Sequence, residues 1–219
     1  MPLEDEVKLE VPRDFTEPAI APDGGIDEIE LIPEVRTVTI YFDTADGRLQ
    51  QAKTALRFRY RIGAEKFPGQ HDPVNPEPGQ EGIWATKTKG RLVESQGVTA
   101  TERHELEVRS TFAELPDTAM ESLGIEVSRA ELRVIAAMDA RRSSRRIVAD
   151  TVEAMQIDDD LVHVIAGPAA GEVFREVEFE LTDARFAQLR SRLVESFIAS
   201  GAKYSSAGSK LERALGLGH

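Results

Sequence analysis

The chain has 219 residues, of which 41% are hydrophobic and 30% are charged, a composition typical of a folded globular protein and compatible with a single domain over residues 1–219. A net charge of -12 argues against broad electrostatic binding of nucleic acid or of an anionic membrane. The absence of cysteine excludes disulfides and thiolate-bound metals, and no apolar run reaches the ~18 residues of a membrane span. Because the first residues are not typical of a signal peptide, we expect a cytoplasmic protein.

Strand patterns dominate the chain. Apolar and polar residues alternate in LEDEVKLEV (3–11), and further strands are expected at 37–44, 55–62, 82–90, 102–110 and 171–181. The acidic segment 12–34 is expected to contain a short helix at 26–31. The proline- and glycine-rich segment 67–82 predicts a long exposed loop.

The C-terminal half mixes helix and strand patterns. Residues 112–137 favour short helices or a helix followed by a strand, whereas RRIVAD, EAMQID and DLVHVI indicate strands. Residues 182–201 form the clearest helix pattern, with Thr182 or Asp183 as its cap and Gly201 as its stop. We therefore predict a mainly β (α+β) fold, in which about eight antiparallel strands form a barrel or a strongly curved sheet with flanking helices.

Several predicted strands carry a face made only of charges. These faces contain Glu4, Glu6 and Lys8; Arg57, Arg59 and Arg61; Arg103, Glu105, Glu107 and Arg109; and Glu176, Glu178 and Glu180. For one strand, a solvated outer face is the simplest interpretation. Rows of like charges disfavour that interpretation for the whole set, because like-charged neighbours repel. In a closed sheet the charged faces could line a lumen, where basic groups bind phosphate and carboxylates hold a bridging divalent cation.

The order of these segments resembles that of the CYTH family, the triphosphate tunnel metalloenzymes. Glu4-Asp5-Glu6-Val7-Lys8 resembles its E-x-E-x-K signature, and the next matches are YFDT (41–44), LRFR (56–59), WATK (84–87), RHELE (103–107) and REVEFEL (175–181). Arg141-Arg142 resembles a later arginine strand of the family, and Asp158 resembles its metal-side aspartate. Ser209-Lys210 resembles its C-terminal serine–lysine pair. The resemblance implies an eight-stranded antiparallel β-barrel tunnel that binds triphosphate in its lumen.

The resemblance also implies a role for each matched residue. Mg2+ or Mn2+ would be held by Glu4, Glu6, Asp158, Glu176 and Glu178, with Glu105 and Glu180 as further candidates. The phosphates would be bound by Lys8, Arg57, Arg59, Lys87, Arg103, Arg141 and Lys210, with Arg145 on the same parity as Arg141. Glu105 would either orient one of these basic groups or serve as an additional carboxylate on the metal side. A slip of one residue within 141–146 would exchange lumen and outer faces.

The resemblance leaves the reaction open. Metal-dependent hydrolysis of inorganic triphosphate to pyrophosphate and phosphate is the first choice, because it needs only the phosphate-binding residues. A thiamine triphosphatase would add an aromatic or apolar platform at one tunnel mouth, for which Trp84 and Phe15 are candidates, and a class IV adenylate cyclase would need an adenine pocket. A non-catalytic polyphosphate-binding module is the alternative of another class. Relatives sometimes continue into a helical CHAD domain, so a longer parent protein with that partner domain also stays open.

Overall fold

The computed structural model describes residues 3–63, 72–88, 90–206 and 208–217. Its strands are β1 (Leu3–Val11), β2 (Glu28–Asp43), β3 (Thr54–Arg61), β4 (Glu81–Thr88), β5 (Arg91–Ser95), β6 (Val98–Thr111), β7 (Arg133–Ala149), β8 (Val152–Ala166), β9 (Val173–Leu181) and β10 (Lys203–Tyr204). Its helices are α1 (Arg48–Gln51), α2 (Asp117–Glu121), α3 (Ala187–Ala199) and α4 (Lys210–Ala214), with 3-10 turns at Arg129–Glu131 and Ala184–Phe186. Within these ranges no helix is both long and apolar enough to cross a membrane.

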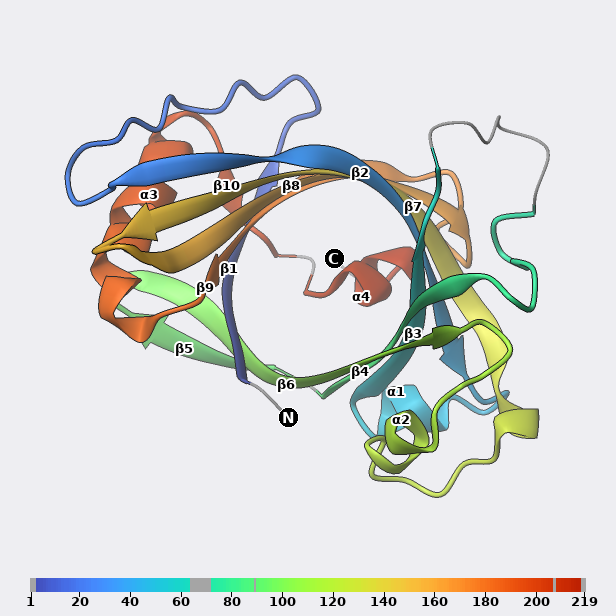
Figure 1. Cartoon of the computed structure of the whole chain (residues 1–219). Coiled ribbons are helices and arrows are strands. Elements are labelled where there is room, and N and C mark those ends of the chain that lie inside the picture. Colours follow the sequence, from blue (N-terminus) through green and yellow to red (C-terminus); the bar gives the residue numbers. More distant parts are fainter. Residues whose placement is uncertain (1–2, 64–71, 89, 207, 218–219) are drawn as a thin grey trace.

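Eight of the strands close into an antiparallel barrel (Figure 1). The strands pair in the order β1-β9-β8-β7-β2-β3-β4-β6, and the pairing of β6 with β1 completes the ring. The short strands β5 and β10 extend the sheet beside β6 and β1. Register shifts in the β2–β7 pair, between Ile32 and Val35 and between Tyr41 and Phe42, mark local bends of the kind that help a sheet to curve. The predicted barrel of antiparallel strands is confirmed.

Two apolar cores lie between the barrel wall and the helices outside it. Val7 and Leu9 of β1 pack in a cluster with Phe197 of α3, and Phe58 of β3 packs in a second cluster with Ala119 of α2. Figure 1 shows α3 on one side of the ring and α1 with α2 on another. Because successive strand residues point to opposite faces, burying the apolar faces outside the ring turns the charged faces inward.

A third core lies inside the ring, where Figure 1 shows α4. Ala214 packs there against Tyr41, Met138 and Phe174, which come from three barrel strands. The start of α4 is held by a capping box, in which the Ser209 hydroxyl and the Glu212 carboxylate each accept from the other's backbone N–H. This helix brings Lys210 into the barrel interior.

The boundaries of several elements differ from the sequence expectations. The predicted helix at 26–31 is wrong: Glu28 already pairs with Val148, and this pairing with β7 overrides local propensity. EAMQID and DLVHVI belong to one strand, β8. Asp183 accepts from the Arg185 N–H at 3.0 Å and caps a 3-10 turn, so the predicted helix at 182–201 begins later, at Ala187. Residues 67–71 of the predicted loop and residue 89 of a predicted strand lie outside the described ranges.

Candidate functional site

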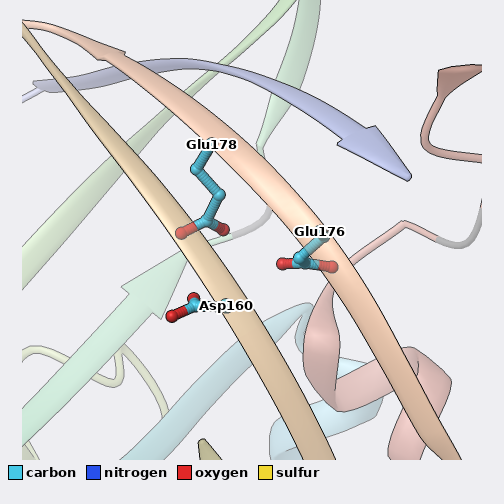
Figure 2. Close-up of side chains that lie close together, drawn as sticks. All are labelled: Asp160, Glu176 and Glu178. Carbon is cyan, nitrogen blue, oxygen red and sulfur yellow. The ribbon is translucent and has the colours of Figure 1, made fainter. Parts of the chain in front are cut away.

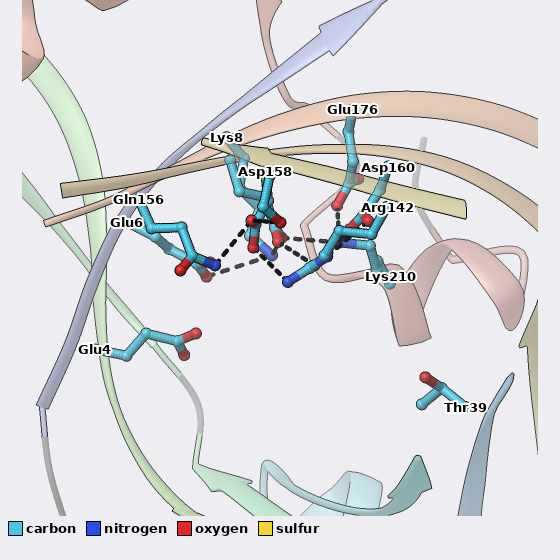
Figure 3. Close-up of polar contacts among 12 residues, drawn as sticks. Glu4, Glu6, Lys8, Thr39, Arg142, Gln156, Asp158, Asp160, Glu176 and Lys210 are labelled. Carbon is cyan, nitrogen blue, oxygen red and sulfur yellow. Dashed lines mark hydrogen bonds and ion pairs between the residues drawn. The ribbon is translucent and has the colours of Figure 1, made fainter. Parts of the chain in front are cut away.

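The barrel interior holds a network of charges of both signs. Figure 3 shows Glu4 and Glu6 on β1 facing the same space as Asp158 and Asp160 on β8, with Lys210 reaching in from α4. The network consists of Glu4, Glu6, Lys8, Arg57, Lys87, Arg103, Glu105, Arg142, Asp158, Asp160, Glu176, Glu178 and Lys210, joined by ion pairs. Apart from Arg142 and Asp160, these are residues to which the sequence assigned a role.

Three buried carboxylates form the most compact acidic group, here called the acid triad. Asp160 of β8 and Glu176 and Glu178 of β9 are 1%, 3% and 8% exposed, and each offers an oxygen within 4.8 Å of the other two. Figure 2 shows the three side chains converging from neighbouring strands. Carboxylate oxygens are the ligands that Mg2+ and Mn2+ prefer. The acid triad is therefore the candidate metal centre.

A single lysine contacts all members of the acid triad. Lys210 Nζ lies 2.9 Å from Asp160, 2.5 Å from Glu176 and 2.9 Å from Glu178. Burial favours the protonated acids, but Lys210 and Arg142 lower the pKa of Asp160 to about 2, and Lys210 helps to hold the pKa of Glu178 well below its usual value.

At Glu176 burial prevails, and its pKa is raised. Its Oε1 atom lies close to the Lys210 ammonium but makes no well-aligned hydrogen bond with any described residue. Lys8 and Arg142 also contact the acid triad. What the triad offers to a further cation is therefore this poorly aligned Glu176 oxygen, not an excess of negative charge.

The arginine that enters this network from β7 is Arg142. Its Nε donates to Asp160 at 2.8 Å and its Nη2 donates to the same carboxylate at 2.5 Å. Arg141 is exposed, and Arg145, on the same parity, pairs with Glu17 of the segment that follows β1. The expectation that Arg141 and Arg145 face the lumen is therefore wrong. Adjacent arginines look alike in sequence, and the register of β7 against β8 decides between them.

Asp158 faces the lumen, as predicted, but lies outside the acid triad. It accepts from Ser144 at 2.6 Å and from Gln156 at 2.9 Å, and it pairs with Arg142. Asp160, two residues further along the same face, takes the triad position. Sequence reasoning missed Asp160 because only Asp158 matched the family pattern, although period-two alternation puts both side chains on one face. A metal role for Asp158 stays a prediction.

The E-x-E-x-K stretch of β1 also faces the lumen. Glu4 accepts from Arg103 at 2.6 Å and from Lys87 at 3.2 Å, and Glu6 pairs with Arg103 as well. Burial would raise the pKa of Glu4, but Lys87 and Arg103 outweigh it and lower that pKa to about 2. Lys8 Nζ lies 3.3 Å from the Glu6 carboxylate and 2.8 Å from that of Glu178, so it links Glu6 to the acid triad. Metal binding by Glu4 and Glu6 stays a prediction, since neither belongs to the acid triad.

Glu105 lies between two basic groups on neighbouring strands. Its carboxylate is 2.7 Å from Arg57 Nη2 and 2.7 Å from Lys87 Nζ, so it orients both cations. Burial, with the charges of Arg57 and Arg103, lowers the pKa of Lys87 to about 8. Glu180 is exposed near the end of β9 and has no ion-pair partner among the described residues.

Arg59 is a lumen cation without a carboxylate partner in the described part of the chain. Its Nε donates to the Thr39 hydroxyl at 3.2 Å. Burial, and then the charges of Arg57 and Arg142, lower its pKa to about 10. It lines a pocket together with Arg142 and Lys210. A largely desolvated guanidinium without an anion favours an anionic ligand at this place.

The aromatic residues considered for a substrate platform lie outside the lumen. Trp84 is 3% exposed, with its ring centroid 5.0 Å from that of Phe58 in the outer core. The centroid of Phe15 is 6.0 Å from that of Phe197 of α3, in the other outer core. The interpretation of Trp84 or Phe15 as a platform at the tunnel mouth is wrong.

No protein-family model and no curated protein matches the chain. Solved structures do match. HpAC1 from Hippeastrum, a candidate adenylyl cyclase described as having a dominant triphosphatase activity, has a TM-score of 0.61 and 17% identity over 95% of this chain and 93% of its own. A candidate adenylate cyclase from Bacillus halodurans has a TM-score of 0.53 and 16% identity over 82% of each chain. The likeness concerns the fold, and the shared barrel agrees with the resemblance of the sequence to the CYTH family.

Proposed function

We propose that this chain, which shares its fold with a protein described as a triphosphatase, is a divalent-metal-dependent triphosphatase whose first candidate substrate is inorganic triphosphate. The observation that carries the proposal is the charge arrangement inside the barrel. A buried acid triad suited to a divalent cation lies beside a pocket lined by Arg59, Arg142 and Lys210. Carboxylates and basic side chains in one confined space suit a complex of a divalent cation with a polyanion: the carboxylates would bind the cation and the basic side chains the polyanion.

The acid triad fits Mg2+ or Mn2+ through Asp160, Glu176 and Glu178. All three offer hard oxygen ligands, and the buried Glu176 Oε1 lacks a well-aligned donor among the described residues. A bound ion would supply charge neutralisation to the phosphate oxygens.

The basic residues would bind and orient the phosphates. Phosphoryl transfer depends mainly on positioning and on stabilising the charge of the transferring group. Arg59 can take up a phosphate oxygen without breaking an ion pair within the described chain, whereas Arg57 and Lys87 must first exchange their contacts with Glu105. Arg59 is therefore the first phosphate ligand that we expect, and Arg57 and Lys87 extend the basic surface.

The lining of this small pocket offers polar contacts to phosphate but none to an aromatic ring. Besides the charged residues, the lining consists of Thr37, Thr39, Met138, Ala140 and Val162. None of these described lining residues offers an aromatic face for the ring of thiamine or adenine. Stacking and apolar contact are the usual means by which a protein binds such a ring.

Phosphate release tests the proposal directly. Tripolyphosphate, ATP and thiamine triphosphate are compared in parallel with Mg2+, with Mn2+ and with EDTA. We expect metal-dependent release that is fastest from tripolyphosphate. Faster turnover of thiamine triphosphate, or cyclic AMP formation from ATP, would replace the substrate assignment. No release from any of them, together with tight binding of tripolyphosphate, would favour the non-catalytic polyphosphate-binding module.

A further inference from the structure

The ammonium group of Lys210 lies at the centre of the acid triad. Its Nζ is 2.9 Å or less from an oxygen of each carboxylate, and Figure 3 shows it beside Glu176 and Asp160. These are the carboxylates that a divalent ion would use as ligands. Two cations so close to the same oxygens would repel each other strongly in a buried site. The ammonium and a metal ion therefore cannot both hold this position.

Other contacts anchor α4 without Lys210. Arg213 Nη2 donates to Glu10 at 2.6 Å, and its guanidinium carbon lies 4.4 Å from the centre of the Phe174 ring. Ala214 is fully buried in the core inside the barrel. Lysine has a long, flexible stem. Its ammonium can therefore leave the acid triad while the helix stays in place.

The acid triad borders a small pocket. Lys210 also lines the pocket that contains Arg59 and Arg142. With a phosphate in that pocket, the displaced ammonium would gain an anionic partner in place of the carboxylates it has lost.

We propose that Lys210 is an internal counter-ion that competes with the divalent metal for Asp160, Glu176 and Glu178, and that metal binding displaces its ammonium toward the phosphate pocket. This inference rests on the part of the proposed function that places a metal at the acid triad. Lys210 neutralises the carboxylates before the metal arrives and becomes available to phosphate afterwards. Metal binding then precedes productive capture of the triphosphate.

Mn2+ titration by calorimetry, without substrate, tests the competition. The variants are Lys210→Met, which keeps the length of the side chain but removes its charge, and Lys203→Met as a control, the same change at an exposed lysine of β10. Without the competing ammonium, we expect Lys210→Met to bind Mn2+ roughly 5–150-fold more tightly than the wild type, the usual range for coupled binding. Lys203→Met should bind Mn2+ like the wild type, because it retains Lys210 and the contacts that anchor α4.

Thermal unfolding gives a second readout that does not depend on turnover. In EDTA, Lys210→Met should melt at a lower temperature than the wild type, because its buried carboxylates have lost a partner. Mn2+ should raise its melting temperature by more than it raises that of the wild type, since ligand stabilisation grows with affinity.

The outcomes separate this inference from the proposed function. Equal or weaker Mn2+ binding by Lys210→Met overturns the competition and leaves the metal site in place. No Mn2+ binding by any variant overturns both the metal site and the competition. If Lys210→Met does not fold, amine labelling of the wild type, read at Lys210 by mass spectrometry, decides: faster labelling of Lys210 on adding Mn2+ supports displacement of its ammonium, and unchanged labelling overturns it.

Discussion

Replacing Arg142 by methionine tests the assignment of the lumen face of β7. Arg142 is bound by three carboxylates, including Asp160 at 2.5 Å and Glu178 at 3.0 Å, and its side chain is 21% exposed. Removing one partner of a buried ion pair costs ~3–5 kcal/mol. Partial exposure favours the lower end, about 3 kcal/mol. For a chain of this length, that loss lowers the melting temperature by roughly 6–12 °C.

Arg141→Met is the matched control, because it makes the same chemical change one residue away. Arg141 is exposed, so its loss should change stability by no more than about 0.5 kcal/mol. Thermal unfolding in EDTA measures both variants, and kcat with tripolyphosphate should fall by ~100-fold or more for Arg142→Met alone. If Arg141→Met were the destabilised and inactive variant, the register of β7 against β8 described above would be refuted.

Further predictions concern the basic wall, the acid triad and the outer core. Burial lowers the pKa of Lys87 to about 8, and an amine binds phosphate only when it is protonated; if Lys87 is a phosphate ligand, kcat/KM should fall as the pH rises through about 8. In Lys87→Arg this fall should move to higher pH, and an unchanged pH profile would contradict the assignment. Glu176→Gln should weaken Mn2+ binding by at least ~10-fold in calorimetry, since one charged ligand is lost; wild-type affinity would exclude Glu176 as a ligand. Trp84→Ala should lose ~3–5 kcal/mol in denaturant unfolding but keep its kcat at low temperature, whereas a selective loss of kcat would place Trp84 at the substrate.

The direction of the lumen side chains could be predicted from short-range pattern. In β1 the alternation of Glu4, Glu6 and Lys8 with Val7 and Leu9 separates a charged face from an apolar one. The strand geometry enforces that separation whatever the partner strand is. The apolar residues are fully buried in the outer core and the charged ones face inward, as expected. The same alternation predicts that Asp160 faces the lumen once Asp158 is known to do so, because residues two apart on a strand point to the same face.

Choices that depend on distant partners could not be predicted in this way. Glu28 begins a strand and not a helix because it pairs with Val148, more than a hundred residues away. The sequence allows Trp84 to be a substrate platform, but the outer core buries it. In both cases local sequence allows several outcomes, and the tertiary contact selects one.

By itself, the sequence determined which faces of the strands are charged and hence which residue types line a closed barrel. Only the tertiary structure decided which charges meet. The register of β7 against β8 places Arg142, not Arg141, beside Asp160, and the packing of α4 inside the ring carries Lys210 to the acid triad. The physical reason is that alternation along a strand is a local property. Register and helix docking depend instead on burial and hydrogen bonding across the whole fold.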